Sequence, residues 1–157
     1  MHEVTVLHPG IVITSIALVI ATVLVHGVGT HAFIRFLVRR HSDSDGLIKA
    51  SNSLRAVIWT AIVLMALHVI EIHLWALTYM LVLPGDTLDT YEKAVYFSFV
   101  TFTTLGYGDV TLSTQDWRVL SGVEAMNGIL LAGWSTALLF VVVQRSWSSV
   151  ERDEAGH

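Results

Sequence analysis

Apolar positions run through the chain in three long segments that are separated by short polar stretches. From Val4 to Ile34 there is no Asp, Glu, Lys or Arg, and this run predicts a helix from Ile11 to about Val38. Two further helices are expected from about Ala56 to Leu83 and from about Trp117 to Val143. A helix needs about 20 apolar residues to cross a bilayer, so each segment predicts a transmembrane helix.

A fourth apolar segment, from Thr90 to Thr103, lies between the second and third spans and has only about 14 residues, too few to cross a bilayer. Thr90 is a candidate N-cap, and Glu92 favours a helix start there. Pro84 and Gly85 end the span before it. The pattern therefore predicts a re-entrant helix, which enters the membrane and returns on the same side.

Composition supports a membrane protein. The chain is 54% hydrophobic and 14% charged, with a mean hydropathy of +0.64, whereas soluble domains carry about 25% charged residues. The formal charge of −4 gives no reason to expect nucleic acid as a partner, and the chain has no cysteine for disulfides or thiolate metal sites. The start, Met1-His2-Glu3, is not basic, which favours a retained first helix over a cleaved signal peptide.

Basic residues predict the orientation. Five of the nine Lys and Arg residues lie between Arg35 and Arg55, so this loop is expected on the cytoplasmic side. The N-terminus is then outside, the loop after the re-entrant helix opens outside, and the C-terminus is cytoplasmic. We expect a multi-pass protein of the plasma or inner membrane.

The segment from Thr103 to Asp109 reads Thr-Thr-Leu-Gly-Tyr-Gly-Asp and follows the short helix directly. Non-helical backbone at membrane depth persists only where it is buried in protein or lines a water-filled cavity. Gly106 and Gly108 supply backbone angles that other residues adopt only at a cost. This segment is the main candidate for a functional site.

This string, set between a short aromatic helix and a long glycine-containing span, resembles the pore module of tetrameric potassium channels of the bacterial type. The resemblance covers roughly Leu54 to Arg145. It implies a homotetramer, because each chain supplies one strand of a ring of backbone carbonyls that replaces the water shell of K⁺. The implied selectivity filter is Thr104, Leu105, Gly106, Tyr107 and Gly108, with K⁺ bound at the first four.

The resemblance divides the chain into four parts and gives roles to residues around the filter. The parts are an N-terminal transmembrane helix at 1–40, a cytoplasmic linker at 41–53, the pore module at 54–145 and a cytoplasmic tail at 146–157. Thr103 ends the pore helix, and Tyr96 and Phe97 stand where the family has aromatic residues around the filter. Gly128 stands at the hinge glycine of the inner helix and Gly133 at a second family glycine.

Two departures from the family are visible. Leu105 replaces the commoner valine or isoleucine, and Val100 stands where some bacterial members carry a glutamate behind the filter. Asp109 is therefore expected to find another partner, either Tyr96 or water.

The third span carries further candidates. Helical spacing from Gly128 places Thr136 and Phe140 on one stripe, where four Phe140 rings could close a cavity by dewetting; alternatively Phe140 faces lipid or the second span. Glu124 is an acid at membrane depth and should face the protein interior. It is read as a brace behind the filter, bonded to hydroxyls such as those of Thr101 or Thr103, or as a proton-sensitive gate.

Ionisable residues also lie in the first two spans. His68 and Glu71 share a face of one helix, and His73 points elsewhere. His26 and His31 on the first span are candidate partners for Glu71. Three interpretations remain open: a buried hydrogen-bonded contact between helices, a pH-sensing pair, or a metal or haem site.

The predicted fold is an all-α membrane protein with three transmembrane helices, a re-entrant pore helix and a filter loop, assembling as a tetramer. The predicted function is passive, potassium-selective conduction, with K⁺ in the filter and no organic cofactor. No nucleophile–base set suggests an enzyme, no span repeats arginine as a voltage sensor does, and no regulatory domain is evident. A non-selective cation channel and a non-conducting haem or metal carrier are the alternatives.

Overall fold

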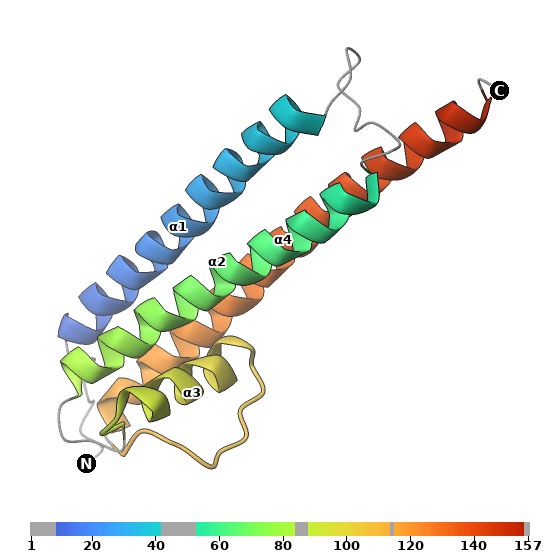
Figure 1. Cartoon of the computed structure of the whole chain (residues 1–157). Helices are drawn as coiled ribbons and strands as arrows, with labels where there is room; N and C mark the ends of the chain where they lie inside the picture. The colour runs from blue at the N-terminus through green and yellow to red at the C-terminus, as the bar shows by residue number, and fades with distance from the viewer. Residues whose placement is uncertain (1–8, 42–52, 84–87, 114, 156–157) are drawn as a thin grey trace, which may run out of the picture. The chain divides into compact units, whose positions relative to one another are not determined.

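The computed structural model describes residues 9–41, 53–83, 88–113 and 115–155. This part of the chain is helical and contains no strand, which confirms the predicted all-α class. The elements in chain order are α1 (Pro9–His41), α2 (Ser53–Val82), α3 (Tyr91–Phe102), the short 3₁₀ helix η2 (Gln115–Trp117) and α4 (Arg118–Ala155) (Figure 1).

Among the described residues, three helices are long and apolar enough to cross a membrane, over Pro9–Arg39, Ser53–Val82 and Arg118–Ser148. They begin and end within a few residues of the predicted spans, except that α4 continues to Ala155. The tail predicted from residue 146 onward therefore begins as helix, because residues 144–155 contain no glycine or proline to end it. Most of the predicted linker, residues 42–52, lies outside the described residues.

The short helix α3 has 12 residues, or about 18 Å of length, which cannot cross a hydrocarbon core of about 30 Å. Its N-cap is Thr90, as predicted, and the Thr90 hydroxyl accepts a hydrogen bond from the backbone N–H of Lys93 at 3.3 Å. Thr103 is its C-cap. In Figure 1 an extended loop follows α3 and leads to α4.

The chain forms two compact units. The first comprises residues 1–24 and 70–130, so it holds the start of α1, the end of α2, all of α3 and the start of α4. Tyr79 on α2 is completely buried in this unit, and its ring packs edge-on against Phe97 of α3 with 5.2 Å between centroids. The Asn127 amide on α4 donates a hydrogen bond to the Thr22 hydroxyl on α1 at 2.8 Å. The Tyr79 hydroxyl also donates to the Glu124 carboxylate on α4 at 2.7 Å, so contacts link all four helices within this unit.

The second unit comprises residues 25–69 and 131–157. Its core is built from Leu37, Ala56 and Val142, one from each long helix, with Phe33 and Val57 packed against them. The Ser146 hydroxyl on α4 donates to the Ser53 carbonyl at the start of α2, at 3.4 Å.

The outward face of α1 is apolar. Its side chains are uncovered over several turns, with Ile13 67% exposed and Val28 67% exposed. Such a continuous apolar face is unfavourable in water and favourable in lipid, as expected for a membrane-spanning helix.

Candidate functional site

The loop after α3 has an unusual backbone. φ is positive at every second residue, with 61° at Thr104, 56° at Gly106 and 77° at Gly108. Glycine adopts such angles freely, whereas a residue with a Cβ atom loses about 1–2 kcal/mol. Thr104 is the one non-glycine residue with positive φ in the described part of the chain. Its neighbours must therefore hold it there.

Alternation of the sign of φ determines where the peptide groups point. Turning every second residue over gathers successive N–H groups on one side of the chain and the carbonyl groups on the other. From this alternation we expect the carbonyls of residues 104–107 to lie on one side of the loop. The side chains of Leu105 and Tyr107 are 58% and 66% exposed in the single chain.

Hydrogen bonds fasten the loop to the end of α3. The N–H of Thr104 donates to the Thr101 carbonyl at 2.9 Å, and the N–H of Gly106 donates to the Val100 carbonyl at 3.3 Å. Both donors therefore point back toward the helix. The C-terminal end of α3 carries partial negative charge, which favours a cation close to Thr103.

A side-chain hydrogen bond between Tyr96 and Asp109 also connects the loop to α3. The Tyr96 hydroxyl donates to the Asp109 carboxylate at 2.6 Å, so Asp109 bonds to Tyr96, one of the two partners expected in place of the missing glutamate. This bond lowers the pKa of Asp109 and raises the pKa of Tyr96. It joins the middle of α3 to the residue just after the loop.

The Tyr96–Asp109 bond predicts a pH effect. In Tyr96→Phe the pKa of Asp109 is expected to rise toward its ordinary value, because the donor that stabilises the carboxylate is gone. A lowered folded-state pKa contributes stability above the unfolded-state pKa of Asp109, and this contribution is lost as pH falls through the folded value. The measurement is an NMR titration of carboxyl-labelled aspartate, with Asp109→Asn for assignment.

The control for this titration is Tyr91→Phe, which removes an exposed hydroxyl from the same helix and leaves the bond intact. An Asp109 pKa that is equal in Tyr96→Phe and in the unaltered chain would show that the bond does not form in solution.

Glu124 is completely buried, as expected of a residue facing the interior. Its partner is Tyr79 on α2, whose hydroxyl donates to the carboxylate at 2.7 Å. The Thr103 hydroxyl, one of the partners named from the sequence, donates instead to the Phe99 carbonyl one turn back, a bond that helical threonine forms readily. Tyr79 was not predicted as the partner of Glu124, although a buried tyrosine in an apolar helix needs a partner for its hydroxyl.

Gly128 lies where α4 passes the end of α3. A Cβ atom at this position would collide with the carbonyl oxygen of Phe102, so only glycine permits this approach. Gly133, one and a half turns later, has nothing within 4 Å of such an atom. α4 is a single helix through both residues, and their predicted hinge role stays a prediction.

The other sequence candidates are split between surface and interior. Phe97 is buried against Tyr79. Thr136 and Phe140 lie on the exposed side of α4, with Phe140 58% exposed. The Thr136 hydroxyl donates to the Ala132 carbonyl of its own helix at 2.9 Å. The gate predicted at Phe140 stays a prediction.

A family model described as "Ion channel" matches residues 65–145, which is just over half of the chain and includes α3, the loop and most of α4. The chain therefore belongs to this ion channel family. The described part of the chain contains three helices that can span a membrane, and the family resemblance inferred from the sequence is confirmed.

Among curated proteins, the chain is similar to two-pore potassium channel 4 of Arabidopsis thaliana. The two are 34% identical over 76 residues, which is 46% of this chain. The matched region spans only 27% of the plant protein, so this chain covers about a quarter of that relative. No solved structure matches the chain.

Proposed function

We propose that four copies of this chain form a potassium-selective channel that conducts K⁺ passively through a filter of backbone carbonyls. The observation that carries the proposal is the alternation of φ at Thr104, Gly106 and Gly108. This alternation favours a loop with its carbonyls on one face, and a ring of four such faces can replace the hydration shell of a cation. The proposed K⁺ ligands are the carbonyls of Thr104, Leu105, Gly106 and Tyr107.

Potassium is proposed over other cations for three reasons. The Gly-Tyr-Gly string is that of the potassium channel family, and the relative from Arabidopsis thaliana is named a potassium channel. Carbonyl oxygens are neutral dipoles, so they favour a weakly hydrated monovalent ion over one that gives up water reluctantly.

The uncovered apolar residues of the first unit support a tetramer. Met126 is 74% exposed on α4, and Ile129 and Leu130 are more than 60% exposed nearby. Leu105 and Tyr107 of the loop are also more than half exposed in this unit, and a neighbouring copy would cover exposed apolar side chains of this kind. One loop per chain makes four copies the number that closes the ring.

The remaining assignments follow from this arrangement. Residues 54–145 form the pore module, 1–40 an additional span, 41–53 a cytoplasmic linker and 146–157 a cytoplasmic tail. The N-terminus lies outside, because the basic residues between Arg35 and Arg55 favour the cytoplasm. Tyr96, Thr103 and Asp109 support the filter from the side of α3.

Ion flux through the purified chain in liposomes tests the proposal. A potassium gradient is expected to drive flux that barium blocks, while an equal sodium gradient gives at least tenfold less. Equal flux of the two ions would replace the proposal by a non-selective cation channel, an outcome that Leu105 would help to explain. No flux of either ion across the accessible range of pH would contradict conduction itself.

A further inference from the structure

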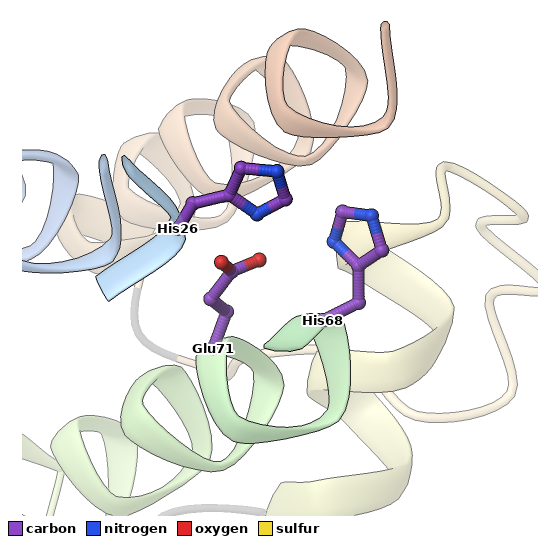
Figure 2. Close-up of side chains that lie close together, drawn as sticks. All are labelled: His26, His68 and Glu71. Carbon is purple, nitrogen blue, oxygen red and sulfur yellow. The ribbon is translucent and has the colours of Figure 1, made fainter. Parts of the chain in front are cut away.

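In the second unit, hydrogen bonds hold α1 and α2 together through α4. The Ser135 hydroxyl on α4 lies 2.9 Å from Nε2 of His68 on α2 and 3.2 Å from Nε2 of His26 on α1. Figure 2 shows the two imidazoles, whose ring centroids are 5.2 Å apart. This contact fixes the separation of α1 and α2 in the middle of their lengths.

Nearer their basic ends, α1 and α2 enclose a groove of about 580 Å³, a volume within the range of about 300–1,000 Å³ found for ligand sites. Its apolar lining residues are Phe33, Phe36, Leu37, Ala56, Trp59 and Val63. Arg55 adds a positive charge to this lining. All of these residues belong to the second unit and precede the matched channel region, which begins at residue 65.

The groove runs along α2 from its polar start into the membrane-spanning part. Arg55 and Val63 are eight residues apart, or about 12 Å along the helix axis. Trp59 lies between them, and tryptophan is enriched at the depth where a membrane meets water. The charge in the groove is therefore placed at the depth of lipid headgroups, and Val63 at the depth of acyl chains.

Two more arginines lie beside the groove. Arg35 and Arg39 line an adjoining hollow, and Phe36 borders both. Because they are four residues apart on α1, their like charges are neighbours on one helix face and repel. Among the described residues, no acidic side chain forms an ion pair with Arg35, Arg39 or Arg55. A phosphate group would remove this repulsion, and arginine can bind phosphate through two parallel hydrogen bonds.

Positive charge gathers at this end of the two helices alone. From Arg35 to Arg55 the sequence has five Lys or Arg residues against Asp43 and Asp45, whereas residues 4–34 and 56–92 contain no Lys or Arg. Basic pockets between membrane helices bind the headgroups of anionic lipids. The groove thus combines an apolar wall for an acyl chain with a basic end for an anionic headgroup.

We propose that this groove binds one anionic phospholipid of the phosphatidylglycerol class per chain. Its phosphate is bound between Arg55 and the Arg35–Arg39 pair, and an acyl chain lies along Trp59 and Val63. Free phosphate would leave the apolar wall uncovered, and a zwitterionic lipid would leave the positive charge without a counterion. The proposal requires a membrane but not conduction, so it can fail or succeed independently of the proposed channel function.

Lipid retention by the full-length protein tests the proposal. The chain is purified in detergent, washed free of lipid and incubated with equal amounts of dioleoyl phosphatidylglycerol or dioleoyl phosphatidylcholine, and bound lipid is counted by native mass spectrometry. We expect one phosphatidylglycerol per chain, bound about tenfold or more tightly than phosphatidylcholine. Inorganic phosphate is not expected to displace it.

Charge variants test the headgroup site. Arg39→Gln and Arg55→Gln are each expected to weaken phosphatidylglycerol binding about fivefold, the effect of one basic residue close to anionic lipid. Arg145→Gln is the matched control, because Arg145 is exposed on α4 of the same unit and does not line the groove. It removes the same charge and is expected to leave binding unchanged. Arg35→Gln serves in place of either variant if that variant does not fold.

A second pair of variants tests the acyl-chain wall. Val63→Trp places a larger side chain in the groove and is expected to lower phosphatidylglycerol retention, because it occupies the volume of the acyl chain. Met65→Trp is the control, since Met65 is exposed on the same helix outside the groove. Its retention of phosphatidylglycerol should equal that of the unaltered chain.

Three results would overturn the proposal. The first is equal retention of phosphatidylglycerol and phosphatidylcholine, and the second is unchanged retention when Arg39 and Arg55 are both replaced by glutamine. The third is a smaller oligomer in Val63→Trp at unchanged lipid retention, which would assign the groove to a neighbouring copy of the chain. Thermal unfolding of each variant without lipid separates a loss of binding from a loss of fold.

Discussion

Gly128→Ala is expected to destabilise the folded chain strongly and to reduce the yield of assembled protein. The added Cβ atom would collide with the carbonyl oxygen of Phe102, which is backbone and cannot move aside without moving α3. Overpacking of this kind lowers the free energy of unfolding by about 1–3 kcal/mol and occasionally more. The higher helix propensity of alanine raises it by only about 1 kcal/mol. The measurement is thermal unfolding in detergent together with size-exclusion chromatography.

Gly133→Ala is the matched control for this effect. It makes the same chemical change in the same helix, but nothing lies within 4 Å of the added atom. Its unfolding temperature should equal or slightly exceed that of the unaltered chain. If Gly128→Ala and Gly133→Ala unfold alike, the close approach of α4 to α3 is wrong, and a shared effect on conduction alone would favour the hinge interpretation.

Gly106→Ala is expected to abolish potassium selectivity while the protein still assembles. φ at Gly106 is 56°, and an alanine held there loses about 1–2 kcal/mol. In the proposed tetramer the strain occurs in each of four chains, so about 4–8 kcal/mol would oppose the conformation that aligns the carbonyls. Potassium and sodium flux through the variant in liposomes should become equal or disappear.

Gly122→Ala provides the comparison for the filter variant. Gly122 lies in α4 with no positive φ and nothing within 4 Å of an added Cβ atom. It should conduct as the unaltered chain does. Full potassium selectivity in Gly106→Ala would mean that the backbone of this loop does not coordinate the permeant ion.

The helices of this fold could be predicted from sequence, because the thickness of the bilayer sets how long an apolar run must be to cross it. The three spans and the short α3 follow from run length alone, and Thr90 follows from capping chemistry. The end of α4 was placed too early because its last turns are polar. A polar sequence that lacks glycine and proline can continue a helix beyond the apolar stretch.

Contacts between helices were less predictable, because spacing along one helix says nothing about which neighbour it faces. His26 and His31 are five residues apart and hence about 140° apart around α1. Spacing shows that only one of them can meet α2, and the structure shows that it is His26, packed against His68. The rotation of each helix about its own axis, which the sequence does not give, also decides two other contacts. These are the bond between Glu124 and Tyr79 and the contact of Gly128 with Phe102.

The hydrogen bond between Asn127 and Thr22 has a consequence for synthesis. The two residues are 105 positions apart, and at about 5–20 residues per second the ribosome needs roughly 5–20 s to complete that stretch. During this interval Thr22 is already in the newly inserted first helix while Asn127 has not been made. The Thr22 hydroxyl also donates a hydrogen bond to the Leu18 carbonyl of the same helix at 2.9 Å. This polar group therefore has a hydrogen-bond partner in lipid before α4 is inserted.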